Sequence, residues 1–269
     1  MYNGWGSIYW DSSVGDTAAW GLHLQSPPNV GVADQPLVDE FTTNYIVGGE
    51  ALCLAPNFDN YTSEMGAISG ITSPSNGSAE FNGTSDYIQL PDPFSLTNHT
   101  IAAWAYANDT ATNKDIFDNR DGNDDGIRLL CLNDETFFYS VNSNDIQYTT
   151  PVINKWVYVV ATYDGTTQRL YIDGSQIASA TTSQTISTTT NARIGAESYS
   201  LDKYFNGNLA NVAIWNRALT SDEINSVMWK GYDSLTASEQ NGLQAWYALD
   251  NITGTDVPDS TGNYNGTAY

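Results

Sequence analysis

Residues 156–177, WVYVVATYDGTTQRLYIDGSQI, decide the fold, because they have the pattern of three strands joined by two tight turns. Residues 156–163 are β-branched and aromatic, which suits a pleated surface. Apolar side chains occupy both faces of this strand, so we expect a central strand that is covered on both sides. Asp164-Gly165 and Asp173-Gly174 are hairpin signals, because Asp and Gly tolerate positive φ. The stretch therefore predicts an antiparallel meander.

The rest of the chain continues the same pattern of short strands and turns. Strands are expected at 51–54, around Phe81, and at 87–90, 100–106, 126–132 and 136–141. This succession indicates a β-sandwich and not alternating βαβ units. One helix is predicted after Thr220, which forms a capping box with Glu223 and is followed by a stop signal at Gly231. A second capping box of the same kind is expected at Thr236 and Glu239.

The composition excludes several classes of function. The chain has 269 residues, with 9 Lys and Arg against 31 Asp and Glu and a net charge of -22. Such a surface repels phosphate backbones, so we expect no nucleic-acid partner. Nothing approaches the ~20 apolar residues of a membrane helix, and we expect no membrane insertion. The first residues carry neither a basic region nor an apolar run, so a signal peptide is not expected.

The two cysteines are Cys53 and Cys131. Free cysteine is among the most buried residue types, so two buried free thiols are the favoured interpretation. A single disulfide between them is the alternative. Neither cysteine has metal-ligand spacing.

Five motifs in order carry a family resemblance. They are AEFNGTSDYI at 79–88, IAAWAY at 101–106, the 156–177 stretch, ARIG at 192–195 and FNGNLANVAIWNRAL at 205–219. Together they resemble the laminin-G-like domains of the concanavalin A-like lectin and glucanase superfamily over roughly residues 50–230. The resemblance implies an all-β fold, a two-sheet antiparallel jelly-roll sandwich with one short helix near the C-terminal side. Fold by itself does not give function.

Three segments follow from this interpretation. Residues 1–45 are expected to be an N-terminal arm or small β attachment segment, and residues 46–230 the sandwich. Residues 231–269 are a C-terminal extension that resembles the first strand of a second repeat. An exposed strand of this kind is an aggregation liability, so we expect it to be paired. Pairing with its own sandwich is favoured over donation to another subunit.

The residues of the chain give no catalytic constellation. Glycanases of this superfamily use two nearby carboxylates, which appear as alternating acids on a strand. No such run occurs, and His23 and His99 lack a Ser or Cys setting that suggests a nucleophile. We therefore predict a protein that is not an enzyme, and a glycoside hydrolase is the least favoured reading.

Calcium is the candidate cofactor. Residues 118–126, DNRDGNDDG, offer hard oxygen ligands together with glycines for tight bending. The candidate ligands are Asp118, Asp121, Asn123, Asp124 and Asp125. The family resemblance points at Asp124 and Asp125. In laminin-G-like domains a calcium site often lies at the rim of the sandwich, beside the loop that enters the hairpin predicted here at residues 126–141. A solvated Asp/Gly turn is the alternative.

Sugar-binding candidates are aromatic residues near loop or helix ends. They are Tyr199, Tyr204 and Trp229, whereas the tryptophans inside predicted strands, Trp104, Trp156 and Trp215, are expected in the core. An acidic chain that combines a lectin-like domain with an arm and a strand-like tail also resembles phage structural proteins, including those of marine phages.

The resulting hypothesis is a virion surface protein, as a head decoration, a fibre component or a tail adhesin. Its expected partners are other virion proteins, copies of itself and cell-surface glycans. The alternative is an extracellular bacterial carbohydrate-binding module or adhesin.

Overall fold

The computed structural model describes residues 77–269, except 92–93, 95, 109–112, 133–134, 151–152 and 187–191, and the backbone of strands 6–10 and 20–24. The chain divides into two compact units, Met1–Thr72 and Ser73–Tyr269. In the first unit, β1 (Gly6–Trp10) pairs antiparallel with β2 (Trp20–Leu24), as expected for two small strands. The strand predicted at 51–54 and Cys53 lie outside the described residues. Over the described range, no helix is long and apolar enough to cross a membrane.

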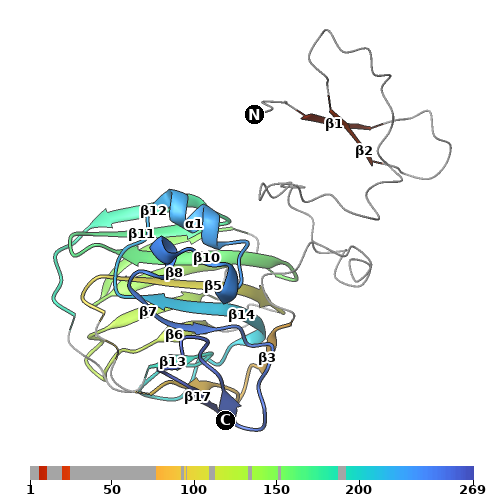
Figure 1. Ribbon diagram of the computed structural model, residues 1–269. Helices are drawn as coiled ribbons and strands as arrows, with labels where there is room; N and C mark the ends of the chain where they lie inside the picture. The colour runs from red at the N-terminus through yellow and green to blue at the C-terminus, as the bar shows by residue number, and fades with distance from the viewer. Residues whose placement is uncertain are drawn as a thin grey trace, which may run out of the picture. The chain divides into compact units, whose positions relative to one another are not determined.

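The second unit is a sandwich of two antiparallel sheets, shown in Figure 1. The first sheet has seven strands in the order β12-β11-β10-β5-β14-β15, with β3 also pairing with β14. Its strands are β3 (Ala79–Asn82), β5 (His99–Ala107), β10 (Trp156–Tyr163), β11 (Thr167–Ile172), β12 (Ser175–Thr181), β14 (Asn206–Trp215) and β15 (Leu243–Tyr247). The meander predicted from residues 156–177 is confirmed as β10, β11 and β12.

The second sheet has eight strands in the order β16-β17-β4-β13-β6-β7-β8-β9. They are β16 (Asp256–Val257), β17 (Gly266–Ala268), β4 (Ile88–Gln89), β13 (Arg193–Ile194), β6 (Lys114–Asp118), β7 (Ile127–Cys131), β8 (Thr136–Val141) and β9 (Asn144–Thr149). The hairpin predicted at 126–141 is confirmed as β7 and β8. The all-β two-sheet prediction is therefore correct.

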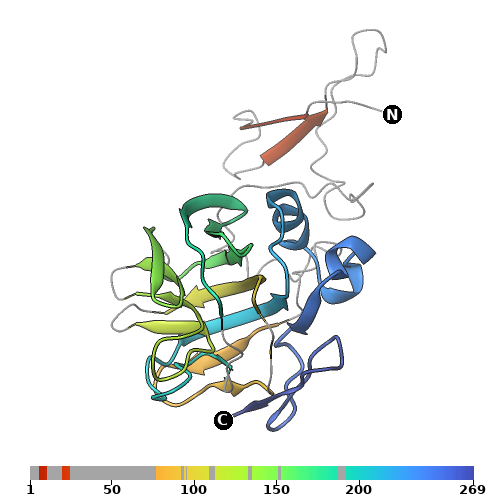
Figure 2. The same cartoon turned by 90° about the vertical axis from the view of Figure 1, so that its left-hand side faces the viewer.

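The main hydrophobic core fills the space between the two sheets, where β10 contributes Val157 and Val159. A second core lies on the outer face of the seven-stranded sheet. There Val160 of β10 packs with Trp215 and Ile224 under the helices α1 (Ser221–Val227), η4 (Tyr232–Ser234) and α2 (Ala237–Gln240). Figure 2 shows α1 and α2 on the side of the sandwich away from β6 to β9. Strand β10 is thus covered on both faces, as its sequence predicts.

Both capping boxes are present, because Thr220 exchanges hydrogen bonds with Glu223 and Thr236 does so with Glu239. Each box satisfies N–H groups that a helix start leaves unpaired. The expected stop at Gly231 is wrong: α1 ends at Val227. Met228 is the C-cap, and the chain after the helix stays packed on the second core through Met228 and Trp229.

The C-terminal segment belongs to both sheets. β15 pairs with β14 in the seven-stranded sheet, and β17 pairs with β4 in the eight-stranded sheet. The buried carboxylate of Asp259 holds the connection by accepting hydrogen bonds from the backbone N–H of Trp246 at 2.8 Å and of Tyr264 at 3.0 Å. The observed pairing is with the chain's own sandwich.

The strands predicted around Phe81 and at 87–90 are β3 and β4, and they lie in different sheets. β3 lies in the seven-stranded sheet and β4 in the eight-stranded one. The turn between them crosses from one layer to the other, and the side-chain oxygen of Asn82 fixes it by accepting from the backbone N–H of Thr84 and Ser85. Cys131 is buried in the core between the sheets.

Candidate functional site on the eight-stranded sheet

A continuous row of polar residues crosses the outer face of the eight-stranded sheet. Residues directly opposite each other on neighbouring strands point to the same face, and the strand registers connect one residue from each strand. Figure 1 shows β17, β13, β6, β7 and β8 in their order across the sheet. From one edge to the other, this polar row is Asp256, Thr267, Gln89, Arg193, Asp118, Arg128, Ser140 and Asp145.

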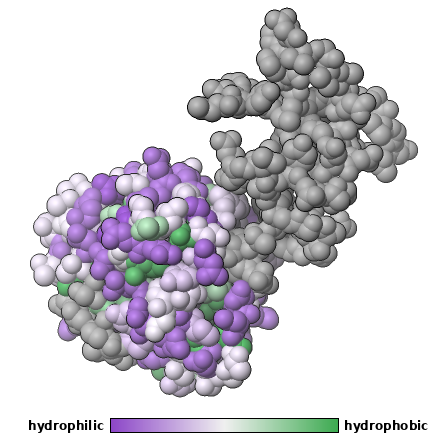
Figure 3. Space-filling model, viewed as in Figure 1, coloured by the Kyte–Doolittle hydropathy of each residue, from purple (hydrophilic) through white to green (hydrophobic). Residues whose placement is uncertain are grey.

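The outer faces of the two sheets therefore differ in kind. On the outer face of the seven-stranded sheet an apolar cluster lies under the helices, whereas the polar row is not part of that cluster. The surface of the second unit that Figure 3 shows is largely hydrophilic, in keeping with the acidic composition. The eight-stranded sheet presents a polar residue on each of its strands at rigid positions, which is an arrangement that suits a binding site.

A bulge in β6 adds a second carboxylate to this face. Residues three apart on a regular strand point to opposite faces. In β6, however, the register with β7 shifts between Asp115 and Phe117, so that Asp115 opposes Leu130 and Asp118 opposes Arg128. The extra residue of the bulge brings Asp115 and Asp118 to the same side. Both carboxylates are fully buried.

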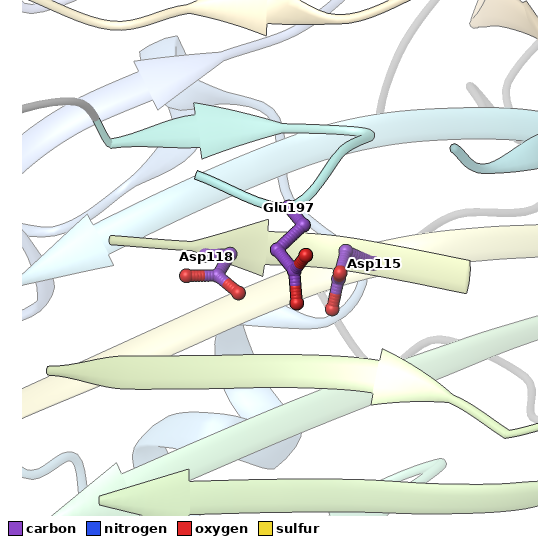
Figure 4. A group of neighbouring side chains, drawn as sticks. All are labelled: Asp115, Asp118 and Glu197. Carbon is purple, nitrogen blue, oxygen red and sulfur yellow. The ribbon is translucent and has the colours of Figure 1, made fainter. Parts of the chain in front are cut away.

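Glu197 joins them from the loop after β13 to form a carboxylate cluster of Asp115, Asp118 and Glu197 (Figure 4). Their ligand atoms lie within 4.8 Å of one another. Two arginines donate hydrogen bonds to these three carboxylates. Arg128 donates Nε to Asp115 Oδ1 at 2.6 Å and Nη2 to Asp115 Oδ2 at 2.9 Å. Arg120 donates Nη2 to Asp118 Oδ2 at 2.8 Å and to Glu197 Oε1 at 3.0 Å.

The loop from residue 197 to 203 closes over the middle of the polar row. Ser198 Oγ donates to Asp118 Oδ1 at 2.8 Å, and Arg193 Nη1 donates to the backbone oxygen of Glu197 at 2.8 Å. The Tyr199 ring lies over Arg120, with the guanidinium carbon 5.6 Å from the ring centroid. Tyr199 remains 48% exposed. The loop thus buries Asp118 while presenting an aromatic side chain above it.

The charges of the cluster are compensated within the protein. Burial raises the pKa of Asp115 to about 7, although the hydrogen bonds and charge of Arg128 oppose that rise. Burial likewise raises the pKa of Asp118. Burial acts in the same direction on Glu197, but hydrogen bonds from Lys203 and Ser200 outweigh it and lower its pKa to about 2.

These residues do not fit a metal ion. Arg120, Arg128 and Lys203 already hold the carboxylate oxygens that a cation would need. A divalent ion takes its ligands as free carboxylate or carbonyl oxygens, so it would have to displace buried cations first. We therefore assign the cluster a supporting role.

A pocket of about 240 Å³ lies beside the cluster on β7, β8 and β9. We call it the arginine pocket, and it is lined by Arg120, Asp124, Arg128, Phe138, Ser140, Ser143 and Asp145. Within the described part of the chain, Arg128 Nη1, Ser140 Oγ and the Asp145 carboxylate have no hydrogen-bond partner. Phe138 is half-buried. The pocket therefore combines a partly exposed aromatic ring with unused donors and acceptors on three adjacent strands.

The five predicted calcium ligands are not gathered into one set. Asp118 and Asp124 both pair with Arg120. Asp121 instead accepts hydrogen bonds from the backbone of Asn123 at 2.9 Å and of Asp125 at 3.1 Å, within its own turn. Asp124 of this loop lines the arginine pocket, and calcium binding by the loop stays a prediction.

The three predicted sugar-binding aromatics lie apart. Tyr199 is near the arginine pocket, through Arg120. Tyr204 is half-buried. Trp229 packs against Trp104, with ring centroids 5.5 Å apart, in the core under the helices and on the opposite sheet. Trp229 is therefore on a different face from Tyr199, and the three do not form one site.

Sequence reasoning missed Asp115, Glu197, Arg120 and Arg128 as site residues. Glu197 lies 79 residues after Asp118, and only the pairing of β13 with β6 brings them together. The one available signal was local: the chain has 9 Lys and Arg in all, and two of them, Arg120 and Arg128, lie within and just after the acidic loop of residues 118–126. Their concentration there indicates a specific use of scarce positive charge.

The fold and the polar face define a lectin-like jelly-roll domain. The sequence matches the family described as the concanavalin A-like lectin/glucanases superfamily over residues 82–225, more than half of the chain. This chain belongs to that superfamily. A comparison with curated protein sequences found no match.

The chain is similar to several solved structures, and the first of these supports the fold. A proposed carbohydrate binding protein from Bacteroides ovatus has a TM-score of 0.59 at 20% identity, over 71% of this chain and 57% of that one. The chain thus spans little more than half the length of that protein. A heptameric SAP-like pentraxin from Limulus polyphemus gives 0.47 at 19% identity, over 55% of this chain and 80% of that one. Domains LG4-5 of mouse laminin α1 give 0.44 at 18% identity, over 54% and 44%.

Proposed function

We propose that the sandwich is a glycan-binding module and that the arginine pocket is its sugar site. One observation carries this proposal: Arg128 Nη1, Ser140 Oγ and Asp145 are in register on three adjacent strands and have no partner among the described residues. A sugar hydroxyl both donates and accepts, so it can pair with an arginine N–H on one side and a carboxylate on the other. The superfamily and the likeness to the Bacteroides ovatus protein support this reading.

The pocket is pre-formed, which favours binding. Arg128 is held by two hydrogen bonds to the buried Asp115, so its remaining Nη1 group is fixed in direction. Phe138 supplies an aromatic surface beside it. A ligand that meets rigid donors and acceptors loses less free energy to ordering of the protein.

The module is proposed to bind without catalysis. Glycoside hydrolysis needs one carboxylic acid and one carboxylate flanking the scissile bond. The carboxylates of the cluster are instead tied to Arg120, Arg128 and Lys203. The cluster holds the arginines of the pocket in place. This positioning explains why its carboxylates are buried, without a catalytic role for them.

The proposed ligand is uncharged. The pocket and the cluster contain five carboxylates, Asp115, Asp118, Glu197, Asp124 and Asp145, against three cations, Arg120, Arg128 and Lys203. The whole chain, with these groups included, has a net charge of -22. An acidic sugar would therefore approach a site whose positive charge is already compensated, and it would be repelled at long range.

The test is an array of neutral and acidic glycans probed with the full chain, once with calcium and once with EDTA. We expect neutral glycans to bind in both conditions. Binding that requires calcium would move the site to the loop of residues 118–126. Failure of every glycan to bind would reject the proposed function.

A matched pair of variants locates the site on the protein. Asp145 and Asp256 are exposed aspartates at the two opposite edge strands of the same sheet, and only Asp145 lines the pocket. Asp145→Ala should weaken binding roughly tenfold, the loss of one hydrogen bond to a charged group. Asp256→Ala makes the same charge change and should leave the affinity unaltered. Equal effects of the two variants would place the site elsewhere.

The place of the module on a virion surface is a separate proposal. Its support is the acidic composition and a distinct first unit, Met1–Thr72, that could serve attachment to other virion proteins or copies of itself. Antibodies against the full chain, applied to density-purified phage particles from a lysate that contains the protein, should label intact particles. Finding the protein only in cell-wall or soluble fractions would favour the bacterial adhesin instead.

A further inference from the structure

A second cluster of side chains lies on the same face, on the other side of the 197–203 loop, with Tyr269 exposed and Tyr87 and Arg193 half-buried. Tyr87 and Tyr269 stack with ring centroids 4.9 Å apart and planes within 6°. Arg193 lies over Tyr87, with its guanidinium carbon 5.3 Å from the ring centroid. Tyr269 is 64% exposed. We call Tyr87, Arg193 and Tyr269 the tyrosine platform.

The platform shares the outer face with the polar row. Tyr87 and Tyr269 adjoin β4 and β17 and continue their pairing, because the backbone N–H of each donates to the backbone oxygen of the other. Arg193, a member of the row, lies over the Tyr87 ring. Gln89 and Thr267 are both members of the row. The platform therefore places an aromatic surface beside polar groups, as the arginine pocket does with Phe138.

The platform is also held rigidly. Arg193 donates Nε to Gln89 Oε1 at 2.9 Å and Nη1 to the backbone oxygen of Glu197 at 2.8 Å. The backbone N–H of Tyr269 donates to the backbone oxygen of Tyr87 at 3.0 Å. A fixed aromatic pair with one exposed ring has apolar area to offer and little side-chain entropy left to lose.

The separation of the two regions decides the size of the ligand. From Gln89 to Ser140 the row passes over β13, β6 and β7, which makes four strand-to-strand steps. At ~4.8 Å a step the regions are roughly 19 Å apart. A single sugar cannot contact both. Between them lies Tyr199, with its half-exposed ring above Arg120.

We propose that the tyrosine platform is a second sugar subsite, and that the ligand is a neutral oligosaccharide that crosses the strands of the eight-stranded sheet over Tyr199. This inference rests on the proposed function of the arginine pocket. One end of the oligosaccharide occupies the arginine pocket, and the other end lies against Tyr269 and Tyr87.

The experiment measures affinity against chain length. Cello-, xylo-, manno-, malto- and chito-oligosaccharides of one to six units are titrated into the full chain and into two variants. Tyr269→Ala removes an exposed ring of the platform. Tyr148→Ala is the matched control, because Tyr148 is also exposed, at 43%, but pairs with the inward-facing Phe137 and so points to the opposite side of the sheet.

The expected result is an affinity that rises with chain length for at least one series. Tyr269→Ala should weaken the longest member roughly tenfold, as expected for one aromatic contact, and leave the shortest binding member unchanged. Tyr148→Ala should change neither. Length-independent affinity, or an equal effect of Tyr269→Ala on short and long members, overturns the second subsite while the proposed function stands. Absence of binding in every series rejects both.

Discussion

The substitution Arg128→Met tests whether a buried ion pair holds the arginine pocket. Arg128 is 10% exposed in its side chain and Asp115 is fully buried, and two hydrogen bonds of 2.6 and 2.9 Å join them. Met keeps the apolar part of the side chain and removes the guanidinium. The carboxylate of Asp115 then lies buried without its partner, which costs about 3–5 kcal/mol of the free energy of unfolding. Urea unfolding at pH 8 measures this loss.

The same variant has a definite pH dependence. The pKa of Asp115 in the folded protein is about 7, above its ordinary 3.8, and Arg128 opposes the rise. A carboxyl with a raised pKa contributes stability at low pH and loses it as the pH rises through the folded-state pKa. Without Arg128 that pKa moves higher still. The variant should therefore be less impaired at pH 5 than at pH 8.

A matched control distinguishes the buried pair from ordinary ion pairing. Arg169 pairs with Asp164 at 2.7 Å, but their side chains are 30% and 33% exposed, so Arg169→Met should cost about 0–1 kcal/mol. Adding Asp115→Met to Arg128→Met should restore much of the lost stability, because no unpaired charge remains buried. Equal costs for the two Arg→Met variants, or a cost that does not change between pH 5 and 8, would refute the reasoning.

Three further predictions concern the frame of the sandwich. Burial lowers the pKa of His99 from 6.5 to about 4, so stability that is complete above pH 6.5 falls by about 3 kcal/mol toward pH 4; urea titrations should show a smaller fall in His99→Gln. Asp259 accepts from four backbone N–H groups, and Asp259→Ala should cost about 2–4 kcal/mol in thermal unfolding; an unchanged melting temperature would contradict its role. Gly207 has φ +138° and a Cβ there would lie 2.0 Å from the Tyr106 oxygen, so Gly207→Ala should destabilise by about 3 kcal/mol. Gly254→Ala, with nothing within 4 Å, should cost about 1 kcal/mol.

Local patterns predicted most of the strands. The alternation in residues 156–177 gave β10, β11 and β12 with their turns, because side-chain parity and Asp-Gly turns act over a few residues. The two capping boxes gave the helix starts for the same reason. The assignment of β3 and β4 to different sheets did not follow, since a short turn within one sheet and a crossing between sheets use similar residues.

The site residues were harder to predict because their geometry is not local. The bulge in β6 turns Asp115 to the side of Asp118, although their spacing on a regular strand would separate them. Trp229 resembled an exposed binding residue at a helix end, yet the second core covers it. No local pattern marks Tyr269 as a binding residue, because the aromatic surface it forms depends on stacking against Tyr87, 182 residues earlier.

The sequence by itself determined the β class, the main meander, the helix caps and the absence of an alternating acid pair, since each depends on neighbours a few residues apart. The tertiary structure decided which face carries polar residues in register, which carboxylates are neutralised by Arg120 and Arg128, and which aromatics remain exposed. Those properties depend on strand order and on the register between distant strands. Many combinations of order and register are compatible with the same local patterns, and the packing of the two sheets selects one of them.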